Sequence, residues 1–201
     1  MTKVKICGLT RPEDVDAVNI LLPEFVGFVF AESKRRVSEE TATALRRRLD
    51  DRVLAIGVFV NNQDIERVAW LCNSGIIDAA QLHGDEDDEY IRRLKKICDG
   101  TIIKSVAVGD TMPDATEAAD FLLFDTLSVQ RGGAGNQFDW NVIKDFRRGP
   151  YFLAGGLNPQ NVRAAIETLN PFCVDVSSGV ETDGVKDPEK IREFINTVKG
   201  I

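Results

Sequence analysis

The sequence contains a single histidine, His83, and no pair of cysteines in a CxxC spacing. Because zinc sites are built from clustered cysteine and histidine ligands, we expect no metal. The cysteines Cys7, Cys72, Cys98 and Cys173 lie in a chain of 201 residues that lacks a long apolar, signal-like stretch near Met1. These features favour reduced thiols over a disulfide framework.

Long apolar runs and an excess of basic charge are also missing. No run approaches the roughly 20 apolar residues that a membrane-spanning helix needs. The net charge is −7, whereas proteins that neutralise nucleic-acid phosphates are usually basic. We therefore expect neither a membrane nor a nucleic acid as partner, and we expect a cytoplasmic protein. The length suits one domain with its own core.

Short apolar runs alternate about eight times with segments that show helical spacing. The runs are rich in Val, Ile and Phe and nearly continuous, as in parallel strands covered on both faces. They span residues 4–7, 25–30, 53–60, 79–83, 101–108, 121–125, 151–155 and 173–177. This α/β pattern predicts a single (βα)₈ TIM barrel over residues 1–201 with short loops. A doubly wound open sheet is the alternative.

Capping residues mark the predicted helix starts. Thr10 and Glu13 have the spacing of a capping box. Asn158 and Asp187 each precede a proline, which is tolerated at the first helical position. Residues 114–119, after the fifth strand, are predicted to hold only about one turn of helix.

Polar residues gather where the predicted strands end, which is where barrel enzymes place their active sites. Cys7 ends the first strand, but a lone cysteine there is equally consistent with core packing. Asp125 directly follows four apolar residues, which favours a functional carboxylate over a helix cap or structural hydrogen bond. Gln81 and Asp175 lie near the ends of the fourth and eighth strands, and we expect both to contact the substrate. His83 fits either a core histidine or a substrate contact.

Two strand ends rich in glycine and serine predict a phosphate site. Gly155 and Gly156 follow the seventh strand, and Ser177, Ser178 and Gly179 follow the eighth. Glycines let backbone N–H groups approach an anion, and barrel enzymes often bind phosphate at this position. Taken alone, the glycine pair is weak evidence for phosphate, because it also fits a simple tight turn.

A series of motifs runs in one order along essentially the whole chain. They occupy residues 5–10, 27–30, 33–35, 57–61, 81–84, 125–126, 132–135, 138–140, 154–159 and 174–181. The stretches GGLNP at 155–159 and DVSSGVE at 175–181 are highly specific together. In these motifs the sequence resembles the phosphoribosylanthranilate isomerase family of tryptophan biosynthesis.

The resemblance implies a barrel enzyme without metal or organic cofactor. It implies an Amadori rearrangement of N-(5-phosphoribosyl)anthranilate to 1-(2-carboxyphenylamino)-1-deoxyribulose 5-phosphate. By the same resemblance Cys7 is the general base, Asp125 is the general acid, and Arg35 lies near the anthranilate carboxylate. Arg36 stands where an aromatic residue is common, and Ala134 stands where the glycine-rich loop often has a hydroxyl.

The chemistry fits these residue types, because one acid and one base suffice to open the ring and move a proton. A cysteine base acts only as the thiolate, so the pKa of Cys7 has to fall for good activity at neutral pH.

The alternative functions are an indole-glycerol-phosphate synthase, a sugar-phosphate epimerase, or a non-catalytic barrel that binds a phosphometabolite. A synthase would need a catalytic lysine, and we expect Lys5 to point differently from Cys7. An epimerase would need metal ligands, and an idle barrel would not need both Cys7 and Asp125. We expect a monomer or a homodimer.

Overall fold

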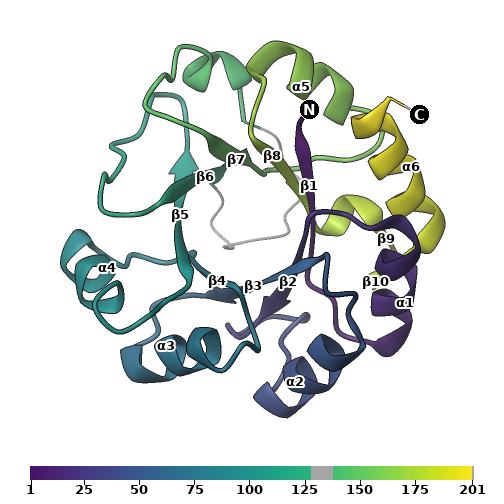
Figure 1. The fold of residues 1–201 in the computed structure, drawn as a ribbon. Coiled ribbons are helices and arrows are strands. Elements are labelled where there is room, and N and C mark those ends of the chain that lie inside the picture. The colour runs from purple at the N-terminus through teal and green to yellow at the C-terminus, as the bar shows by residue number, and fades with distance from the viewer. Residues whose placement is uncertain (128–137, 201) are drawn as a thin grey trace.

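The computed structural model describes residues 1–127 and 138–200. Eight parallel strands close into a barrel in chain order, with β1 paired to both β2 and β8 (Figure 1). The strands are β1 (Lys3–Cys7), β2 (Phe25–Val29), β3 (Leu54–Phe59), β4 (Ala79–Leu82), β5 (Thr101–Val108), β6 (Phe121–Thr126), β7 (Tyr151–Leu153) and β8 (Cys173–Val176). The predicted (βα)₈ barrel is confirmed, and the open sheet is wrong because β8 pairs with β1.

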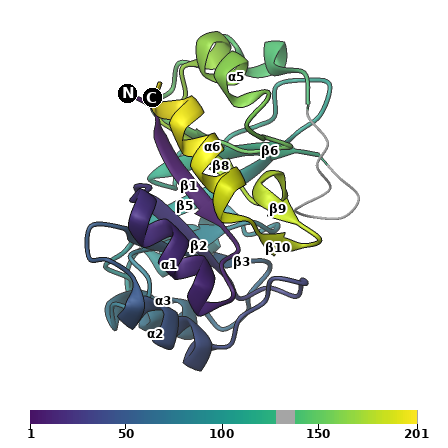
Figure 2. The ribbon, with the colours of Figure 1, turned by 90° about the vertical axis from the view of Figure 1, so that its right-hand side faces the viewer.

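Helices cover the outside of the barrel, and α6 packs beside α1 where the ring closes (Figures 1 and 2). They are α1 (Pro12–Leu21), α2 (Glu39–Arg48), α3 (Ile65–Asn73), α4 (Asp88–Leu94), α5 (Val162–Leu169) and α6 (Pro188–Lys199). Shorter elements are the 3₁₀ turns η1 (Trp140–Ile143) and η2 (Ser178–Val180) and the hairpin strands β9 (Glu181–Thr182) and β10 (Val185–Lys186). The connection 109–120 after β5 contains no helix, which is even less than the single turn predicted there.

The N-terminus of α1 is capped by a different carboxylate from the one predicted. The helix begins at Pro12, so Asp14 rather than Glu13 occupies the third helical position. The carboxylate of Asp14 accepts the backbone N–H groups of Thr10 at 2.9 Å and Arg11 at 3.1 Å. The capping box therefore exists, shifted by one residue.

The two Asx-Pro pairs behave differently. Asp187 caps α6 as predicted and accepts the N–H groups of the second and third helical residues. Asn158 instead accepts the N–H groups of Gln160 and Asn161, which form a turn. Helix α5 starts only at Val162, because the turn that Asn158 stabilises comes first.

The inside of the barrel changes from apolar to polar along the strands. Its apolar layer consists of Ile56, Ala79, Ile103, Leu123, Phe152, Ala154 and Cys173. Side chains alternate in a strand, so the next inward residue lies two positions further on. Leu123 is followed in this way by Asp125, and Cys173 by Asp175. The polar residues therefore line the carboxyl ends of the strands.

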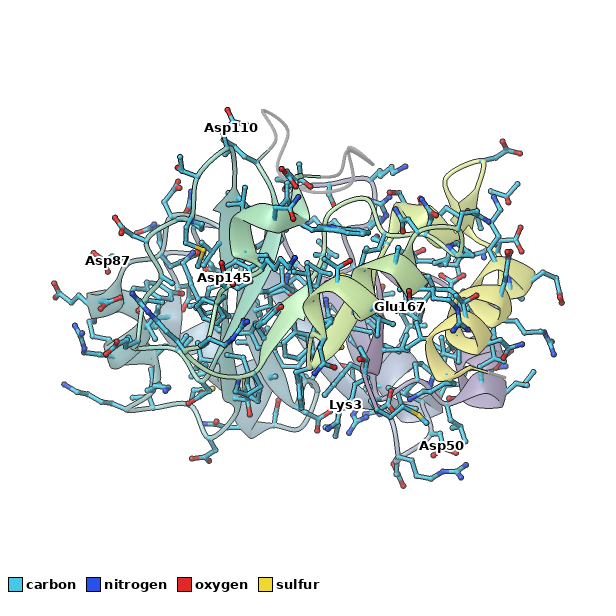
Figure 3. All side chains as sticks on the ribbon, turned by 90° about the horizontal axis from the view of Figure 1, so that it is seen from above. Lys3, Asp50, Asp87, Asp110, Asp145 and Glu167 are labelled. Carbon is cyan, nitrogen blue, oxygen red and sulfur yellow. The ribbon has the colours of Figure 1, made fainter. Side chains whose placement is uncertain are left out.

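The two ends of the barrel can be followed in Figure 3, where Lys3 and Asp50 lie at one end and Asp110 at the other. Lys3 begins β1 and Asp110 follows β5, so the end near Asp110 is the carboxyl end. The polar inward residues belong to this end. Among the helices of residues 1–127 and 138–200, none is long and apolar enough to cross a membrane.

Candidate active site

A buried ion pair between β1 and β8 supports the site. Lys5 is fully buried, and its Nζ lies 2.7 Å from Asp175 Oδ2 and 2.9 Å from Gln81 Oε1. Burial alone would lower the pKa of Lys5, but Asp175 and the neighbouring thiol of Cys7 raise it, so the amine stays charged. The expectation that Lys5 and Cys7 point differently is wrong, because residues two apart share a strand face.

Cys7 lies at the end of β1, buried against β2. A Cβ added to Gly27 would stand 2.6 Å from its Sγ, so the thiol fills the space that the glycine leaves. Burial raises the pKa of Cys7, and the carboxylate of Asp175 adds to this effect. The ammonium groups of Lys5 and Lys186 act in the opposite direction. The pKa of Cys7 is therefore raised, which is the opposite of the shift that a thiolate base needs for good activity at neutral pH.

Lys186 on β10 is a site residue that the sequence did not suggest. Its Nζ is buried and donates to the carbonyl oxygen of Ser177 at 2.9 Å and to Glu181 Oε1 at 2.8 Å. The hydroxyl of Ser177 in turn donates to the carbonyl of Cys7 at 3.0 Å. The hairpin thus holds the ends of β1 and β8 together. A lysine in a short polar hairpin carries no signal of this role.

Asp125 and His83 face each other across the mouth from β6 and from the residue that follows β4. The distance from His83 Nε2 to Asp125 Oδ2 is 3.2 Å, and Asp125 Oδ1 accepts the backbone N–H of Thr126 at 2.7 Å. The side chains of His83 and Asp125 are 16% and 19% exposed, so solvent or a ligand can still reach both groups. His83 is therefore a neighbour of the candidate acid rather than a core histidine.

Gln81 and Asp175, which we expect to contact the substrate, are both buried below the mouth of the barrel. Gln81 is buried, and both ends of its amide are used: Oε1 accepts from Lys5, and Nε2 lies 2.8 Å from His83 Nδ1. Asp175 keeps one oxygen available, since its buried Oδ1 has no partner within the described chain. An unpaired buried acceptor is costly, which points to a donor on a ligand.

Arg35 and Arg36 diverge at the mouth. Arg35 is buried, donates from Nε and Nη2 to Glu181 at 2.6 and 2.9 Å, and lies against Gly8, where a Cβ would be 2.5 Å from its Cδ. Burial would raise the pKa of Glu181, but Arg35 and Lys186 lower it to about 2. Arg36 is exposed on the surface. Only Arg35 therefore lies beside the end of β1.

The strand ends predicted to bind phosphate lie in contact. Gly155 and Gly156 adopt positive φ angles of 89° and 64°, and a Cβ on Gly179 would stand 2.0 Å from the carbonyl oxygen of Leu157. Within the described residues, no loop or turn carbonyl accepts the backbone N–H of Gly156, and Ser178 opens η2, where the first N–H groups have no partner inside the turn. The two ends together therefore present N–H groups at the mouth.

Two further predictions concern the glycine-rich loop around Ala134 and the binding of a metal ion. Ala134 and its glycine-rich loop lie outside the described residues. Within residues 1–127 and 138–200, no three His, Cys, Asp or Glu side chains are grouped so that they could hold a metal ion.

Comparisons with known proteins agree over the whole chain. Residues 4–197 match the model of a family described as N-(5'phosphoribosyl)anthranilate (PRA) isomerase. The N-(5'-phosphoribosyl)anthranilate isomerase of Endomicrobium trichonymphae is 50% identical over 100% of both chains, and that of Clostridium acetobutylicum is 45% identical over 99% of this chain and 98% of its own.

Solved structures agree with the sequence relatives. The phosphoribosyl anthranilate isomerase of Thermotoga maritima is 38% identical, with a TM-score of 0.87 over 100% of both chains. A phosphoribosyl anthranilate isomerase in complex with reduced 1-(o-carboxyphenylamino)-1-deoxyribulose 5-phosphate is 36% identical, with a TM-score of 0.83 and full coverage of both.

Proposed function

The chain belongs to the N-(5'-phosphoribosyl)anthranilate isomerase family, and from this premise we propose roles for its residues. It is an enzyme of tryptophan biosynthesis that converts N-(5-phosphoribosyl)anthranilate to 1-(2-carboxyphenylamino)-1-deoxyribulose 5-phosphate by an Amadori rearrangement. The proposed roles rest on one observation: Cys7 and Asp125 face the same polar mouth from β1 and β6.

Asp125 acts as the general acid. It gives a proton to the ring oxygen of the ribose, the bond from that oxygen to C1 breaks, and the amine nitrogen supplies the electrons to form an iminium. The acid has to be protonated when the substrate binds. Its position at the mouth beside His83 supports this role, because both side chains keep some exposure.

Cys7 acts as the general base. Its thiolate removes the proton from C2, and the electrons of that C–H bond move to the iminium to give an enol-amine. The enol-amine becomes the ketone when its hydroxyl loses a proton and C1 gains one. The ammonium groups of Lys5 and Lys186 stabilise the thiolate, which burial would otherwise disfavour.

The ends of the substrate are held by different groups. Arg35 lies where its guanidinium can donate to the anthranilate carboxylate, a geometry that arginine suits. Asp175 accepts a substrate hydroxyl through its unpaired Oδ1. The phosphate binds to backbone N–H groups of the two adjoining loops at Gly155, Gly156, Ser177, Ser178 and Gly179. The hydroxyl of Ser177 donates to the carbonyl oxygen of Cys7, so Ser177 contributes to phosphate binding through its backbone N–H.

Replacement of the two catalytic groups tests this mechanism. Cys7→Ser and Asp125→Asn should each lower kcat by about 10²–10⁴-fold, the range for a lost acid or base. Binding of the reduced product analogue, measured by calorimetry, should persist because the phosphate loops are untouched. Cys98→Ser, outside the barrel, is the matched control and should keep normal kcat. If Cys7→Ser stayed near normal, the base would have to be sought at Asp175 or His83.

The proposal also covers the location, cofactor requirement and partners of the enzyme. We place it in the cytoplasm, acting without cofactor or metal on a small phosphorylated sugar–anthranilate, with neither nucleic acid nor membrane as partner. It works as a monomer or a homodimer, and light scattering of the purified enzyme distinguishes the two.

A further inference from the structure

A line of polar contacts crosses the barrel from the buried ion pair to the candidate acid. It runs from Asp175 to Lys5 at 2.7 Å, to Gln81 at 2.9 Å, to His83 at 2.8 Å and to Asp125 at 3.2 Å. The groups come from the ends of β8, β1, β4 and β6, so the line joins strands on opposite sides of the ring in Figure 1. Its order of donors and acceptors fixes where the proton on the imidazole lies.

The buried lysine sets that order. An ammonium group can only donate, so the atom of Gln81 that faces Lys5 has to be the carbonyl oxygen. Amide orientation is often ambiguous, but here a flip would place NH₂ against NH₃⁺. The amide nitrogen of Gln81 therefore donates to His83 Nδ1, which has to carry a lone pair. The imidazole proton then resides on Nε2, the nitrogen that faces Asp125.

We propose that Gln81 is a positioning residue that keeps His83 neutral, so that the catalytic proton stays on Asp125. An imidazole is ordinarily a stronger base than a carboxylate. If Nδ1 of His83 were free to accept a proton, the pair would become an imidazolium beside a carboxylate, and Asp125 could not act as the acid. The donor NH₂ of Gln81 occupies Nδ1 and prevents this. The inference rests on the proposed role of Asp125.

The single histidine of the chain makes the protonation state directly measurable. In untagged, ¹⁵N-labelled enzyme at pH 7, long-range ¹H–¹⁵N spectra should show one protonated and one unprotonated imidazole nitrogen, the protonated one being Nε2. Gln81→Glu keeps an acceptor for Lys5 but offers a second one to Nδ1. In that variant both nitrogens should be protonated, and kcat should fall by at least about 10²-fold while KM changes little.

A second variant guards against misfolding of the first. Gln81→Met removes the donor without adding charge, and it should also permit protonation of Nδ1 and lower kcat. Gln63→Glu makes the same amide-to-carboxylate change on an exposed loop, and it should alter neither the spectrum nor kcat. In a His83→Asn background, Gln81→Glu should cause little further loss, because its effect acts through the imidazole.

Two results would contradict the proposed role of Gln81. The proposal is overturned if His83 keeps Nε2–H alone in both Gln81 variants while kcat stays normal, or if the Gln81 and His83 losses simply add. Failure of the acid assignment itself would look different: Asp125→Asn would keep near-normal kcat.

Discussion

A single methyl group at Gly27 should displace the thiol of Cys7, the proposed general base. The Cβ of Gly27→Ala would stand 2.6 Å from Cys7 Sγ, 3.1 Å from its Cα and 3.2 Å from its Cβ. Ordinary contacts between such atoms are about 3.5–4.0 Å, so Sγ has to move by about 1 Å. Gly27 is paired in β2 and has no positive φ, so alanine adds contact without backbone strain.

The expected loss follows from that displacement. A shift of about 1 Å in a reacting group can cost about 10²-fold in rate. The added volume should also lower the free energy of unfolding by about 1–3 kcal/mol. Gly75→Ala is the matched control, since it has a positive φ of 75° with no atom near its Cβ. It should lose about 1–2 kcal/mol of stability with kcat unchanged.

Steady-state kinetics and urea unfolding of both variants separate geometry from stability. We expect Gly27→Ala to lose kcat while its affinity for the reduced product analogue, measured by calorimetry, stays within a few-fold of the parent. A Gly27→Ala enzyme with unchanged kcat would refute the reasoning, because the thiol would then be either free to move without consequence or not the base.

Further expectations follow from the same site. Burial raises the pKa of Cys7, so the ultraviolet absorbance of its thiolate, measured as the difference between the enzyme and Cys7→Ser, should grow as the pH rises from 7 to 9; a thiolate already fully formed at pH 7 would contradict this. Lys5→Met leaves Asp175 without its buried partner and should cost about 3–5 kcal/mol in urea unfolding, whereas a loss under 1 kcal/mol would contradict a tight buried pair. Arg35→Met should lower kcat/KM more than Arg36→Met, and the reverse order would shift the assignment by one residue. Chelators should leave turnover unchanged, and a loss restored by a divalent ion would overturn the metal-free mechanism.

The barrel was predictable because its signals are local. Buried parallel strands require continuous apolar runs, and eight such runs leave few topologies for a chain of 201 residues. Helix boundaries were less secure, because they depend on which residue begins the helix. Asp14 and Glu13 are both carboxylates near Pro12, and only the observed helix start decides between them.

The candidate site was predictable only where its residues end a strand or carry the family's motifs. The roles predicted for Cys7, Asp125 and Arg35 rest on these signals. Lys186 was missed because its burial depends on the fold of the hairpin over Ser177, a contact that no sequence spacing announces. The raised pKa of Cys7 was missed for the same reason, since burial is a tertiary property.

The alternation of side chains explains the remaining error and how the site is built. Lys5 and Cys7 lie two residues apart on β1, and Gln81 and His83 are spaced identically at β4. In each pair the first residue is buried among its neighbours, and the second lies nearer the mouth. Lys5 places a positive charge beside Cys7, and Gln81 sets the direction of the hydrogen bond to His83. Strand ends therefore indicate Cys7 and His83, which lie nearer the mouth, but they do not reveal the hydrogen bonds that Lys5 and Gln81 form below them.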